Sequence, residues 1–347
     1  MPRYDLIIVG AGPAGLATAI AAKQAGLDFR LFEKGVLVNA LFHFPGQMVF
    51  FTTPELLEIG GLPFVTSRDK STRDEALRYY RRVVDTFELD IAFGHTATEL
   101  TTDRVDGFTL TTRDREGRPE RWQSRTVVMA TGCYDHPNLL GIPGEDLPHV
   151  SHYYSEPHPF YRKRVVIVGA KNSAAAAALD LYRAGADVTL VHRGDALASS
   201  IKYWVRPDIE NRIKEGSIRA RFDTRVVEIH PTEVVVEPVR PAGQRSAFRE
   251  RLFGSSDEPA REVVPADAVF LLTGYLADLE FLRACGVAVD PGTGVPQHDP
   301  ETFETNVPGL YLAGAVVVGA NRGEVFIENG RFHGQVVVRE IARRVAG

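Results

Sequence analysis

Cysteine is scarce in this 347-residue sequence, which contains only Cys133 and Cys285. The two lie far apart and form no Cys-x-x-Cys pair. This excludes a disulfide framework and a paired redox dithiol of the Cys-x-x-Cys type. Such sparse, unpaired cysteine fits a reducing compartment, so we expect a cytoplasmic protein.

Strong positive charge and long apolar runs are also missing. A formal net charge of −5 gives no electrostatic footprint for nucleic acid. The apolar N-terminal stretch is interrupted by Gly10, Gly12, Pro13 and Gly15, so it predicts strand, turn and helix and not a signal peptide or membrane span. We therefore expect no nucleic-acid partner and no membrane partner.

Two kinds of catalytic spacing are absent as well. The ten histidines do not cluster like metal ligands, and there is no Gly-x-Ser-x-Gly nucleophile elbow. We therefore predict no metal site and no chemistry of the α/β-hydrolase type.

What the sequence does contain is a strand–glycine-turn–helix unit that occurs twice. In the first copy, Gly10 permits a tight bend, Gly12 lets the backbone approach a pyrophosphate, and Gly15 lets helix and strand pack closely. Pro13 suits the first turn of the helix, whose N-terminus attracts phosphate. Glu33 ends the next strand, where an acid accepts hydrogen bonds from a ribose 2′-OH. This copy predicts FAD; the alternative is an ordinary turn followed by a solvated acid.

The second copy departs from the first in charge. Gly169 opens the turn, Lys171 occupies the middle glycine position, and Ala174 replaces the third glycine. The Lys171 side chain is placed to contact phosphate. The next strand ends at His192-Arg193, and an arginine there grips a 2′-phosphate in a bidentate way. This copy predicts NADPH; the alternative is a basic pair on the surface.

Two further segments suit a flavin ring. Residues 44–53 combine aromatic, amide and hydroxyl side chains, although core packing explains them too. Residues 324–334 begin a helix just past Gly314. A helix N-terminus aimed at the flavin pyrimidine stabilises charge on the reduced ring. Glu328 and Asn329 are alternatively simple first-turn caps.

The cysteines receive different predictions. Cys133 follows Thr131-Gly132 at the end of a buried-looking strand, where the chain passes the cofactor region. It is therefore our candidate for a reactive, catalytic thiol. Cys285 lies in an apolar run and is predicted to be a packed core cysteine.

The motifs predict an α/β fold with two Rossmann-like dinucleotide-binding domains, one split in sequence around the other. We assign residues 1–145 and 276–347 to the FAD-binding domain and residues 146–275 to the NADPH-binding domain. The proline- and glycine-rich stretch 136–148 is predicted to be the first crossing, and residues 273–275 the return.

Periodicity predicts the main elements between the motifs. We expect a helix over residues 73–87 and another from about 327 to 345. The charged segment 237–262 is predicted to be an exposed hairpin loop or a poorly ordered insertion. A small antiparallel set is expected from three strands with period-two patterns, over residues 92–100, 107–112 and 121–130.

Together these motifs resemble the low-molecular-weight thioredoxin reductases and, within them, the YpdA-type bacillithiol disulfide reductases. The resemblance covers nearly the whole chain and implies a thioredoxin reductase-like fold, FAD, NADPH and a homodimer or homotetramer. It is carried by residues 50–52, 130–132, 142–148, 169–173, 200–202, 273–275 and 327–334.

Motifs and resemblance together define the predicted cofactor-binding residues. These are Gly10, Gly12, Pro13, Ala14, Gly15, Glu33, Lys34, Gln47, Phe51, Thr52, Ala130, Thr131, Gly132, Gly169, Lys171, Asn172, Ser173, His192, Arg193, Lys202, Thr273, Gly274, Tyr275, Gly314, Glu328 and Asn329.

The chain departs from the family pattern at three positions. The cysteine proposed to be active in the family lies between the proline and last glycine of the first turn, where this chain has Ala14. Cys133 stands where close relatives usually carry an aromatic residue. Ala315 replaces the aspartate that thioredoxin reductases place after Gly314, as is common in the YpdA-like branch.

The predicted activity is electron transfer from NADPH through FAD to an acceptor. The resemblance implies a low-molecular-weight disulfide such as bacillithiol disulfide. Ala14 favours the alternative of an NADPH–ferredoxin or –flavodoxin reductase, whose protein partner takes electrons without a cysteine. The partner is thus a small-molecule disulfide or a small redox protein of the ferredoxin, flavodoxin or thioredoxin kind. A non-enzymatic, flavin-binding redox sensor is the remaining alternative.

Overall fold

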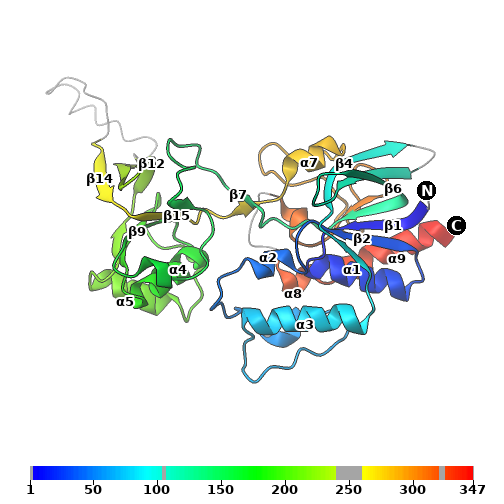
Figure 1. The fold of residues 1–347 in the computed structure, drawn as a ribbon, viewed down its shortest axis with the longest axis horizontal. Coiled ribbons are helices and arrows are strands. Elements are labelled where there is room, and N and C mark those ends of the chain that lie inside the picture. The colour runs from blue at the N-terminus through cyan, green and yellow to red at the C-terminus, as the bar shows by residue number, and fades with distance from the viewer. Residues whose placement is uncertain (1–2, 104–106, 240–259, 320–324, 347) are drawn as a thin grey trace. The chain divides into compact units, whose positions relative to one another are not determined.

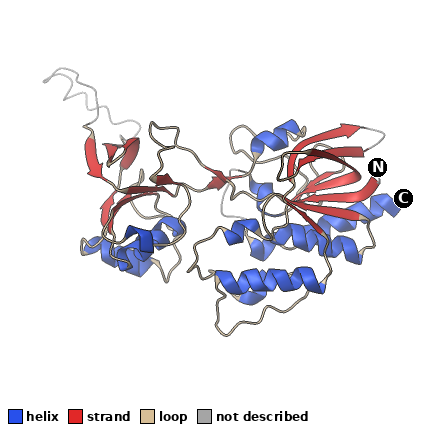
Figure 2. Ribbon diagram, viewed as in Figure 1, coloured by secondary structure: helices blue, strands red, loops and turns tan. Residues whose placement is uncertain are grey.

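The computed structural model describes residues 3–103, 107–239, 260–319 and 325–346. The chain divides into two compact units (Figure 1): unit 1 consists of Met1–Pro137 and Tyr275–Gly347, and unit 2 of Asn138–Gly274. One unit is therefore interrupted in sequence by the other. Helices and strands occur in both (Figure 2), which agrees with the predicted α/β class.

Unit 1 contains a large mixed sheet with helices packed on it. Its strands are β1 (Arg3–Val9), β2 (Phe29–Glu33), β3 (Ile91–Phe93), β4 (Thr96–Asp103), β5 (Gly107–Arg113), β6 (Pro119–Met129), β7 (His136–Pro137), β16 (Tyr275–Leu276) and β17 (Leu310–Leu312). Its helices are α1 (Pro13–Gln24), α2 (Asn39–Phe42), α3 (Arg73–Thr86), α7 (Leu279–Ala284), α8 (Ile327–Gly330) and α9 (His333–Ala346), with 3-10 turns η1 (Pro54–Leu57) and η3 (Gly314–Val318).

The sheet of unit 1 has the order β3-β2-β1-β6-β5-β4, and β17 also pairs with β6. The long strand β6 makes this possible, because it pairs antiparallel with β5 along its first part and parallel with β17 over residues 127–129. β1 alternates its side chains between two cores: Leu6 and Ile8 pack with α1, α3 and α9, while Ile7 and Val9 pack on the other face.

Helix α3 begins where the local sequence favours it. The Thr72 hydroxyl accepts a hydrogen bond from the backbone N–H of Glu75, and the Glu75 carboxylate accepts one from the backbone N–H of Thr72. This reciprocal capping box satisfies two backbone donors at the helix start. The helix predicted over residues 73–87 is therefore confirmed to within one residue.

Two predicted elements differ in detail. The strand expected over residues 92–100 is divided at Gly94, which has φ +72°, so β3 pairs parallel with β2 and β4 pairs antiparallel with β5. The single helix expected from 327 to 345 is divided between α8 and α9. A Cβ at Gly334 in α9 would lie 2.6 Å from the backbone N of Thr18, so the missing side chain lets α9 lie close against α1.

Unit 2 contains a parallel sheet in the order β11-β10-β9-β15-β8 and a three-stranded antiparallel sheet, β12-β13-β14. Its strands are β8 (Val150–Ser151), β9 (Arg164–Val168), β10 (Asp187–Val191), β11 (Arg219–Arg221), β12 (Thr224–His230), β13 (Glu233–Pro238), β14 (Glu262–Pro265) and β15 (Ala268–Leu271). Its helices are α4 (Asn172–Arg183) and α5 (Arg206–Lys214), with the 3-10 turn η2 (His158–Phe160). The ends of the predicted loop 237–262 belong to paired strands β13 and β14, and residues 240–259 lie outside the described residues.

The first junction between the units differs from the expected one. It lies at Pro137/Asn138 and not at 145/146, while the return lies at Gly274/Tyr275, one residue from the expected position. The segment after Asn138 packs within unit 2, where the backbone N–H of Ile229 donates to the carbonyl of Pro143 at 2.9 Å. Proline and glycine mark where a chain turns but not the surface on which it then packs.

The two chain segments at the junctions are paired with each other. β7 and β16 form a short antiparallel ladder in which Tyr275 lies opposite Pro137. Within unit 2, the backbone N–H of Asn138 donates to the carbonyl of Gly274 at 2.8 Å, and the hydroxyl of Thr273 donates to the carbonyl of Asn138 at 2.7 Å. Thr273 and Gly274, predicted to bind cofactor, thus join the two ends of unit 2.

Candidate functional site

The first glycine turn has the geometry that a pyrophosphate requires. Gly10 has φ +104°, and a Cβ there would lie 2.5 Å from the carbonyl oxygen of Ala130. A Cβ at Gly15 would overlap the carbonyl oxygen of Gly10. At Gly12, by contrast, a Cβ would meet no atom within 4 Å. Two glycines are thus needed for packing and one leaves an open approach to the start of α1, as the sequence predicts.

Helix α1 offers uncapped donors at this approach. Gly12 is its N-cap residue and provides no side-chain hydrogen bond, and Pro13 occupies the first turn. The remaining backbone N–H groups and the helix dipole favour an anion there. The residues present therefore fit the phosphate portion of a dinucleotide.

Glu33 lies at the end of β2, beside the same turn. Its side chain is buried, and its two oxygens accept hydrogen bonds from the backbone N–H groups of Ala11 and Gly35, each at 2.8 Å. Burial raises the pKa of this carboxyl, and the two backbone donors oppose that effect. A carboxylate has about four lone-pair sites, so acceptor capacity remains for a ribose hydroxyl. The adjacent Lys34 pairs with Asp135 at 3.0 Å.

Residues 44–53 separate into core and surface positions. Phe50 is buried in the core of unit 1, and its backbone N–H donates to the carbonyl of Ser71 at 2.9 Å. Gln47 and Phe51 are exposed, and Thr52 is half-buried. Core packing thus accounts for Phe50 and leaves Gln47, Phe51 and Thr52 accessible to a ligand.

The C-terminal segment brings Gly314 against the first turn. Gly314 is buried with φ +79°, and a Cβ there would lie 2.7 Å from the Cβ of Ala14. Its backbone N–H donates to Nδ1 of His333 at 3.2 Å. Burial, together with the charge of His298, lowers the pKa of His333 to about 4, so the ring is neutral and able to accept that bond at neutral pH.

The sequence did not predict a role for the His333 side chain at this site. Its ring stacks on Phe303 with centroids 4.1 Å apart. The sequence signal available was its place in the 327–334 stretch, which did not identify a partner. Nearby, Oδ1 of Asn329 accepts from the backbone N–H of Phe326 at 2.8 Å, as the capping alternative for Asn329 predicts. Glu328 is half-buried.

The two cysteines have different surroundings. Cys285 is 7% exposed within the core of unit 1, and burial raises the pKa of its thiol to about 12, with the charge of Asp278 adding to the effect. The prediction of a packed core cysteine is confirmed. Cys133 is half-buried and not in a disulfide. It lies in the loop after β6, where Ala130 is buried and Thr131 and Gly132 are half-buried.

An aromatic cluster lies beside Cys133. The ring of Tyr134 packs edge-on against Phe44, with centroids 5.0 Å apart, and at a tilt of 45° against Tyr275, with centroids 4.5 Å apart. Burial raises the pKa of Tyr275, and the neighbouring Cys133 contributes in the same direction. The structure thus brings Cys133 and Tyr275 together. The catalytic role of Cys133 stays a prediction.

The second glycine turn is in unit 2, between β9 and α4. Gly169 has φ +138°, and a Cβ there would lie 2.6 Å from the carbonyl oxygen of Leu272. Lys171 is the exposed N-cap of α4 and provides no capping bond, and Ser173 is exposed. The end of β10 places His192 half-buried and Arg193 exposed. Burial, and next the charge of Arg193, lower the pKa of His192, so the cationic side chain at this strand end is Arg193.

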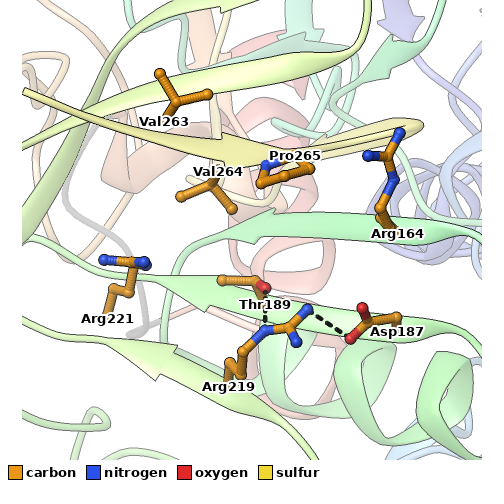
Figure 3. A pocket seen from close by; sticks show the side chains of 8 residues that line it. All are labelled: Arg164, Asp187, Thr189, Arg219, Arg221, Val263, Val264 and Pro265. Atoms are coloured by element: carbon orange, nitrogen blue, oxygen red, sulfur yellow. Dashed lines mark hydrogen bonds and ion pairs between the residues drawn. The ribbon is translucent and has the colours of Figure 1, made fainter.

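Unit 2 also contains a hollow of about 260 Å³ that none of the residues of the second glycine turn line (Figure 3). Among its lining residues, Arg164 and Arg219 begin parallel strands, whereas ligands of parallel sheets bind beyond the carboxyl ends; Arg221 ends β11. Each guanidinium is already paired with a carboxylate: Arg164 with Asp267, Arg219 with Asp187, and Arg221 with Glu262. We therefore do not include this hollow in the candidate nucleotide site.

Within the described ranges, every helix falls short of the length and hydrophobicity that a bilayer crossing needs. In the same part of the chain, no three His, Cys, Asp or Glu side chains gather in a way that would hold a metal ion.

Comparison with known proteins identifies the family. A family model described as "Pyridine nucleotide-disulphide oxidoreductase" matches residues 7–314. Bacilliredoxin reductase Bdr of Bacillus subtilis is 40% identical over 344 residues, which is 99% of each chain. The solved structure of bacillithiol disulfide reductase Bdr (YpdA) from Bacillus cereus is 36% identical, with a TM-score of 0.91 over 99% of this chain and 100% of that one. Its counterpart from Staphylococcus aureus is 33% identical, with a TM-score of 0.89 over 99% of both.

These matches confirm the predicted resemblance and the thioredoxin reductase-like fold. Turns that fit two dinucleotides, in a chain matched from end to end, agree with an enzyme that uses FAD and NADPH. The chain belongs to the pyridine nucleotide-disulphide oxidoreductase family and is an NADPH-dependent flavoprotein oxidoreductase.

Proposed function

We propose that this enzyme reduces a low-molecular-weight disulfide of the bacillithiol disulfide type. The observation that carries the proposal is the similarity, over 99% of this chain, to proteins named bacillithiol disulfide reductase and bacilliredoxin reductase. The net reaction is NADPH + H⁺ + RSSR → NADP⁺ + 2 RSH. The chemistry that bound FAD would supply in unit 1 is hydride acceptance from NADPH and transfer of an electron pair.

The chain's own residues position the two coenzymes in this proposal. Unit 1 holds FAD, with the open side of Gly12 facing the pyrophosphate and Glu33 accepting from a ribose hydroxyl. His333 fixes the backbone of Gly314 beside Ala14. Unit 2 holds NADPH, and Arg193 pairs with the 2′-phosphate. We also propose that the enzyme is cytoplasmic and forms a homodimer or homotetramer. Light scattering of the purified protein tests the oligomeric state.

The sulfur chemistry cannot take place at position 14, because the methyl group of Ala14 is no nucleophile. The remaining half-buried thiol is Cys133, beside Tyr275. In the proposed step, the Cys133 thiolate attacks one sulfur of the substrate and forms a mixed disulfide. One thiolate leaves and takes a proton. An electron pair supplied by NADPH, together with a proton, would then cleave the mixed disulfide, release the second thiol and restore the Cys133 thiolate.

The test is anaerobic oxidation of NADPH with separate acceptors. These are bacillithiol disulfide, glutathione disulfide, an oxidised bacilliredoxin, a ferredoxin and a flavodoxin. We expect bacillithiol disulfide to support turnover in the wild type and in Cys285→Ser, and to support none in Cys133→Ser. Failure of bacillithiol disulfide in the wild type would refute the proposed substrate.

Ala14 favours one second candidate, an NADPH–ferredoxin or –flavodoxin reductase. That activity needs no thiol, because the protein partner takes single electrons. Full activity of a Cys133→Ser/Cys285→Ser variant with ferredoxin or flavodoxin, together with no activity of the wild type on disulfides, would establish it in place of the first proposal.

A further inference from the structure

The loop that follows β10 is fastened to the second glycine turn by three hydrogen bonds. The backbone N–H of Ala198 donates to the carbonyl of Ala170 at 3.0 Å. The side-chain Nδ2 of Asn172 donates to the carbonyl of Ser200 at 3.0 Å, and its Oδ1 accepts from the backbone N–H of Lys202 at 3.0 Å. This loop leads from β10 to α5, and the three hydrogen bonds hold it against the start of α4.

An asparagine is suited to this position because its amide both donates and accepts. The carbonyl of Ser200 requires a donor and the N–H of Lys202 requires an acceptor, so the two backbone partners fix which way the amide points. An aspartate would keep the acceptor and lose the donor, and an alanine would lose both. Asn172 is the first residue of α4, so its backbone is held by the helix.

The two glycine turns present different surfaces to a phosphate. At Gly12 the approach is open, because a Cβ would meet no atom within 4 Å. The corresponding residue of the second turn, Lys171, has an ordinary extended conformation, with φ −101° and ψ −171°, and carries a full side chain. The Cβ of Lys171 therefore occupies the position in the second turn that is equivalent to the open position at Gly12 in the first turn. A pyrophosphate at the second turn therefore meets side chains before it meets backbone.

We propose that Asn172 is a positioning residue that holds Lys202 at the second turn, where the Lys202 ammonium contacts the pyrophosphate of the nicotinamide coenzyme. Lys202 is exposed, and its backbone is bound to the first residue of α4, beside which a pyrophosphate sits in dinucleotide-binding folds. Arg193, at the end of β10, is left to recognise the 2′-phosphate. The inference rests on NADPH as coenzyme and does not depend on the electron acceptor.

The test measures the dissociation constants of NADP⁺ and NAD⁺ for the oxidised holoenzyme, with no electron acceptor present. Binding is monitored by flavin fluorescence or by calorimetry. The variants are Asn172→Ala, Lys202→Ala and the double variant, with Asn211→Ala, an exposed asparagine on α5, as the matched control. We expect Asn172→Ala to raise both dissociation constants about tenfold, and Asn211→Ala to leave them unchanged. The effect should shrink at high salt, because exposed charges are screened.

The double variant separates positioning from direct contact. If Asn172 acts through Lys202, adding Asn172→Ala to Lys202→Ala causes little further loss. Losses that multiply, or no loss with Asn172→Ala alone, would overturn the proposal. A loss confined to NADP⁺ would overturn the assignment of Lys202 to the pyrophosphate. Should Asn172→Ala not fold, as judged by circular dichroism and flavin content, Asn172→Leu, which is similar in size and also lacks both the donor and the acceptor, replaces it in the same cycle with the same expected non-additivity.

Discussion

Replacing Gly12 or Gly15 with alanine adds the same methyl group at two positions three residues apart, with opposite expected results. Gly12 has φ −74° and ψ 177°, which alanine adopts easily, and the new Cβ would meet no atom within 4 Å. At Gly15 the new Cβ would overlap the carbonyl oxygen of Gly10 and lie 3.4 Å from the Cβ of Ala130. Gly12→Ala is therefore expected to affect only the binding of a ligand, whereas Gly15→Ala is expected to lower the stability of the fold.

The magnitudes follow from these contacts. Gly12→Ala should change the stability of the flavin-free protein by less than about 0.5 kcal/mol, as for a substitution without internal contacts. Gly15→Ala should lower that stability by about 2 kcal/mol, because overpacking costs about 1–3 kcal/mol and the better helix propensity of alanine recovers up to about 1 kcal/mol. In a unit of 150–250 residues this lowers the melting temperature by about 4–8 °C.

The assay measures folding and FAD binding separately. Flavin is removed, the melting temperature is recorded by circular dichroism, and FAD is then titrated back by fluorescence quenching. Gly12→Ala should bind FAD at least about tenfold more weakly, with an unchanged melting temperature, because the methyl group occupies the pyrophosphate approach. Gly292→Ala, where the nearest atom lies 3.5 Å from the new Cβ, is the control. FAD affinity like that of the wild type in Gly12→Ala would refute the reasoning.

Three shorter predictions concern single side chains. Arg193→Ala should weaken NADPH binding at least tenfold more than NADH binding, and equal losses would contradict its pairing with the 2′-phosphate. The folded pKa of His333, about 4, lies below its ordinary value of 6.5, so between these pH values only the unfolded chain binds the extra proton. Stability should therefore fall by about 2 kcal/mol as pH decreases through this range, and a urea midpoint in His333→Gln with the same pH dependence as the wild type would contradict this. Iodoacetamide at pH 8 should label Cys133 but not Cys285 in the native protein, whereas both should react in urea; equal native rates would count against the inert core thiol.

The first turn was predictable because its physics is local. The spacing of Gly10, Gly12 and Gly15 specifies a bend, an open approach and a close contact, and the structure contains all three. The sheet around it was less predictable. The division at Gly94 and the two pairing directions of β6 depend on which strands arrive later in the chain, and period-two patterns carry no information about partners.

The parts of the site that the sequence did not predict depend on contacts between distant segments. His333 accepts a hydrogen bond from Gly314, and the identity of neither residue indicates the other. Asn172 is among the predicted cofactor-binding residues, but the sequence does not predict the hydrogen bonds of its amide to backbone groups of Ser200 and Lys202. Residues 44–53 gave two open alternatives because burial was unknown, and the structure places Phe50 inside and Phe51 at the surface.

The paired ends of unit 2 make it an excisable module. Pro137 and Tyr275 face each other in the β7–β16 ladder, so a turn of about two residues between them would convert that ladder into an ordinary hairpin and restore a continuous unit 1. Neighbouring ends are what permit one domain to be inserted into another during evolution. A gene fusion that exchanges residues 138–274 for the corresponding segment of a relative could therefore transplant coenzyme preference as a block.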